Sequence, residues 1–237
     1  MMNRLTDVVK HLLIINVIMF ICFHLTPLSK YSDLLTLYFP ASQEFKPFQI
    51  VSHMFMHASP THILFNMMSL FFLGPMVEQN LGSKRFLIFY LVCGFAAFLL
   101  HIGIDYMSYS QLVGALDAES INSVIAEGRN LLNSGRNWTG EVGELNSIVN
   151  RGMVGASGAI MGVFIAFGLL FPDIKLMLIF PPIPMKAKYL MILMVCIDLF
   201  SGISGFRPGI ANWAHLGGAI MGFILISIWG KNYLLKK

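Results

Sequence analysis

The chain has 237 residues, of which 56% are hydrophobic and only 12% are charged, and its formal net charge is +4. A soluble globular domain carries roughly 25% charged residues, and one small core cannot bury so much apolar surface. Composition therefore argues against a disordered chain, a collagen-like chain, a disulfide scaffold and an ordinary cytosolic enzyme, and it indicates a protein solvated by lipid. The basic residues are dispersed rather than gathered in a stripe, so we expect no nucleic-acid partner.

Six apolar segments are candidates for membrane-spanning helices, because about 20 apolar residues are needed to cross the hydrocarbon core. Their expected ranges are 12–28, 62–77, 86–106, 154–171, 189–203 and 211–229. The first segment could instead be a cleaved signal peptide, but it lacks an A-x-A-like cleavage site, which favours a retained span. We therefore predict an all-α polytopic membrane protein, a bundle of six spans that forms one domain over residues 1–237.

One polar stretch, residues 108–151, interrupts the apolar pattern between the third and fourth spans. Asp117 can cap a helix in it that carries apolar residues at helical spacing, so we expect a small helical insertion. Lysine and arginine are denser in the segments that lie inside if the N-terminus is cytoplasmic, which predicts two cytoplasmic termini and an extracytoplasmic insertion. The small size and the lack of targeting extensions lead us to expect the bacterial inner membrane.

Polar side chains that are costly at membrane depth gather in three short motifs. They are HMFMHASPTHILFN at 53–66, GASG at 155–158 and ANWAH at 211–215. Each motif lies where an even-numbered span begins, and the predicted topology makes these spans enter the membrane from the same side. We therefore expect four side chains to share one depth in the outer leaflet. They are His62, Asn66, Ser157 and His215.

These residue types are suited to nucleophilic catalysis. A serine hydroxyl becomes an effective nucleophile when a base takes its proton, and His215 is the available base for Ser157. His62 and Asn66 are four residues apart, share a helix face, and can donate hydrogen bonds to a developing oxyanion. The Ser157 amide, at a helix N-terminus, is a third donor. No acidic residue lies near Ser157 or His215 in the sequence, so we expect a Ser–His dyad rather than a triad.

Small residues predict that the fourth and sixth spans pack closely. Two G-x-x-x-G pairs, which let helix backbones approach each other, occur at 158–162 and 218–222. They consist of Gly158, Gly162, Gly218 and Gly222. His215 shares a helix face with the second pair, so contact through these faces would bring the histidine beside the serine.

Plainer interpretations of these residues stay open. Membrane serines commonly bond to backbone carbonyls, and polar groups at mid-depth also fit a small transporter or a non-catalytic chaperone that binds client helices. His53 and His57 have a spacing found in zinc sites, but no glutamate lies between them, so we expect structural histidines and no metal. Asp198 in the fifth span could be a proton or ion ligand, or a hydrogen-bond partner near the helix end, which we favour.

Together and in this order, the three motifs resemble those of the rhomboid intramembrane serine proteases, over residues 48–229 without the insertion. The resemblance implies a six-span fold in which Ser157 is the nucleophile and His215 its base. It implies an oxyanion hole formed by His62, Asn66 and the Ser157 amide. It also implies that no cofactor or metal is needed and that the substrates are transmembrane proteins, cleaved at or near the outer ends of their helices. The residues that correspond to structural positions of the family are Gly155, Gly158, Gly218, Gly222 and the acid Glu78.

The sequence departs from the family pattern at two places. The loop before the second span has Phe48-Gln49 where a Trp-Arg pair is common, and Met161 stands where an aromatic residue often packs on the catalytic histidine. These departures bear on substrate preference and loop behaviour more than on the reaction. The glycine-rich loop 202–209 is a candidate lid, on its composition alone.

Overall fold

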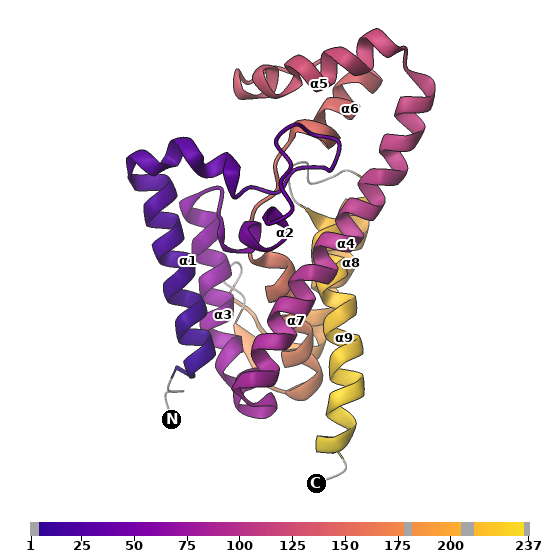
Figure 1. Ribbon diagram of the computed structural model, residues 1–237. Coiled ribbons are helices and arrows are strands. Elements are labelled where there is room, and N and C mark those ends of the chain that lie inside the picture. Colours follow the sequence, from indigo (N-terminus) through magenta and orange to yellow (C-terminus); the bar gives the residue numbers. More distant parts are fainter. Residues whose placement is uncertain (1–4, 178–181, 205–210, 235–237) are drawn as a thin grey trace.

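The computed structural model describes residues 5–177, 182–204 and 211–234, and most of them belong to helices (Figure 1). In chain order the elements are α1 (Asp7–Leu25), η1 (Pro27–Leu34), α2 (Gln49–Ser52), η2 (His53–Phe55), α3 (Pro60–Leu81), α4 (Ser83–Ala115), α5 (Ala118–Asn133), α6 (Gly140–Asn150), α7 (Ser157–Leu170), β1 (Lys175–Met177), β2 (Pro184–Lys186), α8 (Ala187–Ser204) and α9 (Asn212–Leu234). The strands form a short antiparallel hairpin in which Leu176 pairs with Met185. All the other described elements are helices, so the predicted all-α architecture is confirmed.

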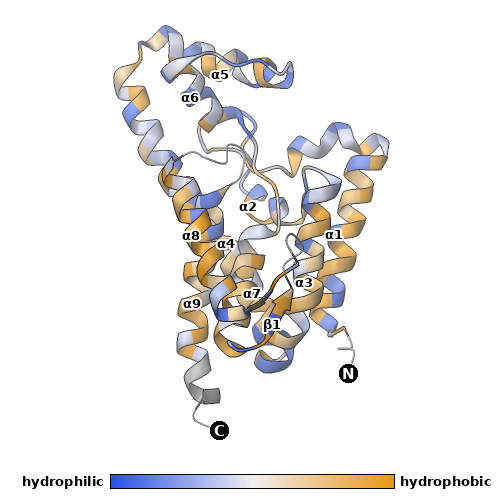
Figure 2. Cartoon of the chain, turned by 180° about the vertical axis from the view of Figure 1, so that it is seen from behind, coloured by the Kyte–Doolittle hydropathy of each residue, from blue (hydrophilic) through white to orange (hydrophobic). Residues whose placement is uncertain are grey.

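Five described helices are long and apolar enough to cross a membrane, namely α1, α3, α4, α8 and α9. Their residues are mostly hydrophobic, as the colouring in Figure 2 shows. Ile18, Phe72 and Phe223 are each more than half exposed on them, which is expected of side chains that face lipid rather than water. The chain is thus a multi-pass integral membrane protein.

The predicted spans match the helices in position but not in length. The third, expected over 86–106, is the longer helix α4, so the first residues of the predicted insertion continue this helix to Ala115. The fourth, expected over 154–171, is the shorter helix α7, which begins only at Ser157. Residues 205–210 of the candidate lid loop lie outside the described residues.

Helix α7 lies at the centre of the bundle and packs against α3, α4, α8 and α9. Ten of its fourteen residues are buried. At about 1.5 Å per residue it is roughly 21 Å long, whereas the hydrocarbon core of a bilayer is about 30 Å thick. Because α4 extends well beyond the start of α7, the N-terminus of α7 is recessed within the bundle (Figure 1). The serine motif is located in this recess.

Glu78, near the end of α3, connects this helix to the starts of α1 and α4 through hydrogen bonds of its side chain. Its side chain is 2% exposed and accepts hydrogen bonds from the amides of Val8 and Val9 at 3.1 and 2.9 Å. It also accepts from the Thr6 hydroxyl, and from the Ser83 hydroxyl at the start of α4 at 2.7 Å. A carboxylate at this position satisfies amides that have no acceptor within their own helix. Glu78 therefore has the structural role that the resemblance implies.

Helices α5 and α6 form the polar insertion, at the opposite end of the bundle from the start of α1 and the end of α9 (Figure 1). Asp117 caps α5 as predicted, accepting a hydrogen bond from the Ser120 amide at 2.8 Å. Arg129 connects the insertion to the segment after α1. Its guanidinium pairs with Asp33 at 2.6 Å and lies over the Tyr38 ring, 4.8 Å from the centroid. The side of the membrane that the insertion occupies stays a prediction.

Candidate active site

Ser157 is the first residue of α7, and the chain before it is held extended by the loop that follows η1. Met153 pairs with Leu37 through two backbone hydrogen bonds of 2.8 and 3.0 Å, and the Gly155 amide donates to a carbonyl of η2 at 2.9 Å. Gly155 has a φ of 133°, and a Cβ there would lie 2.8 Å from the ring of His62. Only glycine fits both the backbone angle and the space, so this residue is required for the chain to enter α7 at the serine.

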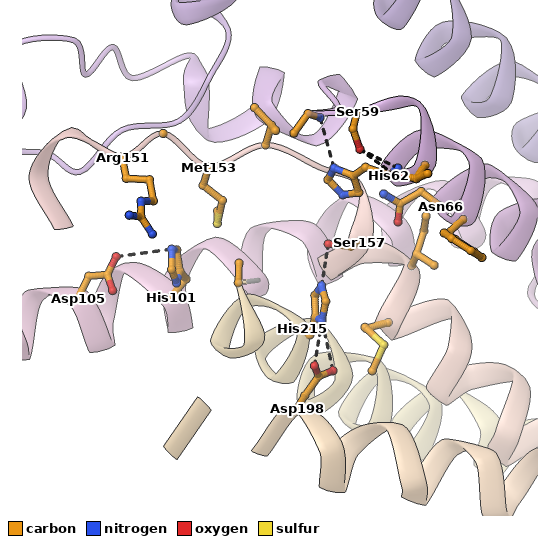
Figure 3. A pocket seen from close by; sticks show the side chains of 18 of the residues that line it. Ser59, His62, Asn66, His101, Asp105, Arg151, Met153, Ser157, Asp198 and His215 are labelled. Carbon is orange, nitrogen blue, oxygen red and sulfur yellow. Dashed lines mark hydrogen bonds and ion pairs between the residues drawn. The ribbon is translucent and has the colours of Figure 1, made fainter. Parts of the chain in front are cut away.

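His215 faces Ser157 from the first turn of α9 (Figure 3). Its Nε2 lies 2.9 Å from Ser157 Oγ. The two residues are 58 positions apart in the chain, and the contact between α7 and α9 brings them together. A hydroxyl hydrogen-bonded to an imidazole is the arrangement that lets a serine lose its proton as it attacks.

Contacts between glycines set the distance between α7 and α9. A Cβ on Gly222 would lie 2.8 Å from the Cα of Gly162, and a Cβ on Gly218 would overlap the carbonyl oxygen of Gly158. On its other side, Gly158 faces the side chain of Ala97 in α4. The absence of side chains at these positions lets the two backbones approach closely enough for the hydroxyl and the imidazole to meet.

His62 is placed to donate a hydrogen bond beside Ser157. The Ala58 amide donates to His62 Nδ1 at 3.3 Å, so the neutral ring carries its proton on Nε2. The Nε2 and the serine hydroxyl both lie near Gly155, because a Cβ on that glycine would be 2.9 Å from Nε2 and 3.7 Å from Oγ. The ring therefore presents an N–H group close to the Ser157 hydroxyl.

Asn66 lies one turn after His62 on α3, and both side chains point towards Ser157 (Figure 3). The Asn66 side chain is buried, and its Nδ2 has no hydrogen-bond partner among the described residues. A buried donor without an acceptor costs roughly 1–3 kcal/mol, so this amide is expected to be used by a group that enters the site.

A cavity of about 870 Å³ extends from Ser157 to helix α6 of the insertion. Its walls come from α3, α4, α6, α7, α8 and α9. Its lining includes the charged residues Asp105, Glu144 and Arg151. Asp105 and Arg151 lie at the end away from the serine, where Asp105 pairs with His101 at 3.5 Å (Figure 3). These charged groups make this end of the cavity polar.

Asp198 is the residue of this site whose position sequence analysis missed. The residue is 2% exposed, and both carboxylate oxygens lie 3.2 Å from His215 Nδ1. Asp198 is therefore a hydrogen-bond partner, as expected, and its partner is His215, whereas the expected Ser–His dyad stays a prediction. Asp198 is 17 residues away from His215, on the neighbouring helix α8, so distance along the sequence concealed the contact. The available signal was the presence of an acid within an apolar span.

His53 and His57 lie in the loop before α3 rather than beside the serine. His53 donates from Nδ1 to the Gln49 carbonyl at 2.8 Å, and His57 packs edge-on against His62 with the ring centroids 5.1 Å apart. Burial lowers the pKa of each of the two histidines to about 4, so both rings are neutral near pH 7. These contacts support the loop from which α3 begins.

Gln49 organises the same loop, a role that the sequence did not predict. The residue is fully buried. Its side chain accepts a hydrogen bond from the Lys46 amide at 3.0 Å and donates one to the Glu44 carbonyl at 2.8 Å.

Its neighbour Phe48 is 54% exposed, and Met161 is buried in the wall of the cavity. The two departures from the family pattern thus occupy a loop and a packing position.

Comparison with known proteins identifies relatives of this chain. The Rhomboid domain model matches residues 44–232. The chain is 30% identical to "Rhomboid protease AarA" of Providencia stuartii over 179 residues, which are 74% of this chain and 53% of that protein. It is 27% identical to "RHOMBOID-like protein 1" of Arabidopsis thaliana over 172 residues, 72% of this chain and 31% of that protein.

A shorter match gives 41% identity to "Putative rhomboid protease YdcA" of Bacillus subtilis strain 168 over 46 residues, 19% of this chain and 23% of that protein. The chain spans about half the length of the first of these relatives and less of the other two. The domain match nevertheless covers most of the chain and includes the three polar motifs. The chain belongs to the rhomboid family.

Proposed function

We propose that this protein is an intramembrane serine protease that hydrolyses peptide bonds in or near the transmembrane helices of other membrane proteins. Two of the relatives are named as proteases or putative proteases. The observation that carries the proposal is the 2.9 Å hydrogen bond between Ser157 Oγ and His215 Nε2, within a membrane protein and at one end of a cavity. No metal or cofactor takes part in the proposed reaction.

In the first half of the proposed reaction, Ser157 Oγ attacks the scissile carbonyl carbon while its proton passes to His215 Nε2. The carbonyl electrons move to oxygen and form an oxyanion. When this intermediate collapses, the C–N bond breaks and the proton on Nε2 goes to the leaving amine. Water then attacks the acyl-enzyme, the imidazole takes the proton of the water, and hydrolysis restores the hydroxyl.

The oxyanion of each step needs hydrogen-bond donors. The Nε2–H of His62, the side-chain amide of Asn66 and the backbone N–H of Ser157 have the proposed role. As the first residue of α7, Ser157 has an amide with no acceptor in its own helix. A single oxyanion donor is typically worth about 10²–10³ in turnover.

A helical substrate has its carbonyls bonded within the helix, so it must unwind locally before Ser157 can attack. Helix-breaking residues near the cleavage site would lower the cost of unwinding, by about 1 kcal/mol for each glycine. The polar end of the cavity supplies water for hydrolysis. In the proposed orientation both termini are cytoplasmic, the insertion is extracytoplasmic, and the protein resides in a bacterial inner membrane.

The proposal is tested by cleavage of a single-span reporter protein in liposomes, with the product sequenced from its new N-terminus. Ser157→Ala and His215→Ala should each lower the cleavage rate at least about 10³-fold, because the nucleophile and the base act as a unit. Ser69→Ala is the matched control. It changes another serine of the cavity wall and leaves the Ser–His pair intact, so cleavage should stay within about threefold of wild type.

Three outcomes would overturn the proposal. Cleavage that survives Ser157→Ala would show that another group is the nucleophile. Transport of a solute that persists in Ser157→Ala, without cleavage by the wild type, would identify a transporter. Binding of client helices that the wild type never cuts would identify a non-catalytic chaperone.

A further inference from the structure

Asp198 is an acid enclosed by the bundle, in helix α8 several residues before its end. Both of its carboxylate oxygens lie 3.2 Å from His215 Nδ1, and the residue is 2% exposed. Figure 3 shows the carboxylate on the far side of the imidazole from Ser157. Hydroxyl, ring and carboxylate therefore form one continuous hydrogen-bonded line.

A buried carboxylate in this setting needs an explanation, because removing an ion from water costs several kcal/mol unless a partner compensates. Among the ion pairs of the described residues, the pair with His215 is the one that includes Asp198. The lysines and arginines in these pairs bind other acids, namely Asp7, Asp33 and Asp173. A bond that served only to join α8 to α9 could be made by neutral side chains at lower cost.

The position of the carboxylate relative to the ring supplies the explanation. An ionised carboxylate can only accept, so the Nδ1 of His215 must carry the proton that it donates to Asp198. The lone pair of Nε2 then faces Ser157, which is the tautomer that a general base requires. When Nε2 takes the serine proton, the imidazolium forms beside a negative charge that stabilises it.

We propose that Asp198 is a positioning residue that fixes the tautomer and orientation of His215 and stabilises the imidazolium formed during catalysis. Its kinetic consequences rest on the proposed protease function, whereas its effect on the tautomer does not. Of the other two acids in the cavity wall, Asp105 bonds to His101 instead, and Glu144 belongs to α6 of the insertion. Asp198 is therefore the acid that acts through the base of Ser157.

The kinetic test uses Asp198→Leu, which removes both the acceptor and the charge, and Asp198→Asn, which keeps the shape. Both should lower kcat for cleavage roughly 10²–10⁴-fold with little change in KM, because the carboxylate touches His215 and not the substrate. The leucine variant also loses a buried hydrogen bond, so its unfolding temperature should fall somewhat whichever role Asp198 has. The loss of kcat in protein that is still folded is what the positioning role predicts, whereas an acid that merely joined α8 to α9 would leave kcat near that of wild type.

The tautomer test is independent of activity. Nitrogen NMR spectra of protein with labelled histidine are recorded at about pH 8, above the ordinary range of a free imidazole in water. The signals of His215 are identified by their loss in His215→Ala. The wild type should show the Nδ1–H tautomer at this residue, and Asp198→Leu should show the Nε2–H tautomer. Asp105→Asn is the matched control, a cavity acid bonded to a different histidine, and it should leave the His215 tautomer as in wild type.

An Nε2–H tautomer in the wild type, or the same tautomer in wild type and Asp198→Leu, would overturn the positioning role whatever the activity. Wild-type kcat in both Asp198 variants would overturn its catalytic consequence. A wild type that has the expected tautomer but cleaves no substrate would contradict the proposed function while supporting the positioning of His215.

Discussion

One methyl group added at the contact between α7 and α9 should separate the hydroxyl from the imidazole. In Gly222→Ala the new Cβ would lie 2.8 Å from the Cα of Gly162, whereas ordinary van der Waals contact begins at 3.4 Å. The opposing atoms belong to the backbone and cannot rotate away, so the helices must open by about 0.6 Å. An opening of that size between Ser157 and His215 would lengthen their 2.9 Å hydrogen bond to about 3.5 Å, the limit for such a bond.

Catalysis should therefore suffer more than stability. A misplacement of about 1 Å near the reacting groups costs roughly 10²-fold in rate, so Gly222→Ala should lower kcat about 10-fold. Overpacking typically costs about 1–3 kcal/mol, and replacing a helical glycine by alanine returns about 1 kcal/mol, which leaves a loss of at most about 2 kcal/mol. Gly218→Ala should have the larger effect on both quantities, because its Cβ would overlap the carbonyl oxygen of Gly158.

Cleavage kinetics and thermal unfolding in the same detergent measure both effects. The matched control is Gly103→Ala on α4, where a Cβ would meet nothing within 4 Å. It should cleave at the wild-type rate and be slightly more stable. If Gly218→Ala and Gly222→Ala cleave as fast as Gly103→Ala, the glycine contact does not set the Ser–His distance and the reasoning is refuted.

Three further predictions concern the oxyanion donors, the helix ends and the loop before α3. Asn66→Ala should lower kcat about 10²–10³-fold and leave the unfolding temperature unchanged, because it removes a donor that has no partner in the described structure. Glu78→Gln should lower the free energy of unfolding by about 2–3 kcal/mol, measured by thermal unfolding. The carboxylate accepts hydrogen bonds from donors at the starts of α1 and α4, and a neutral amide cannot accept all of them. Stability should also fall as the pH drops from about 6.5 to about 4. His53 and His57 have a pKa near 4 in the folded protein because burial disfavours the charged ring, so over this range the unfolded chain binds protons that the folded protein does not. The loss approaches about 3 kcal/mol for each histidine and is measured by unfolding at a series of pH values.

Each of these predictions has a control variant or an outcome that would contradict it. Ser69→Ala on the same helix should keep the activity that Asn66→Ala loses, and equal rates in the two variants would exclude an oxyanion role for the asparagine. An unchanged unfolding temperature in Glu78→Gln would show that its hydrogen bonds do not stabilise the helix ends. His57→Leu should reduce the pH dependence of stability by about half, and a curve identical to that of wild type would contradict the assignment.

The spans and the polar motifs could be predicted because they depend on local properties of the sequence. Apolar length identifies a span, and a histidine or asparagine inside one stands out by its cost. The length of α7 could not be predicted in this way. Residues before Ser157 are apolar enough to continue a helix, but Met153 pairs with Leu37 from a distant loop, and Gly155 turns the chain with a positive φ.

Asp198 and Gln49 show the other limit of sequence reasoning. Whether Asp198 meets His215 depends on how α8 is rotated against α9, and a helix that is apolar on most of its surface gives no periodic signal for that rotation. Gln49 is fully buried because its amide replaces water for several loop groups. Its role depends on which backbone groups of the folded loop lie within hydrogen-bonding distance of the amide, and the sequence does not indicate these groups.

The central claim is that His215 activates Ser157 as a nucleophile, and reaction with a fluorophosphonate followed by mass-spectrometric mapping of the adduct tests it most directly. The account predicts an adduct on Ser157 that is absent in Ser157→Ala, strongly reduced in His215→Ala and retained in Ser69→Ala. A folded wild-type protein that forms no adduct on Ser157, or that labels equally fast without the imidazole, would contradict it.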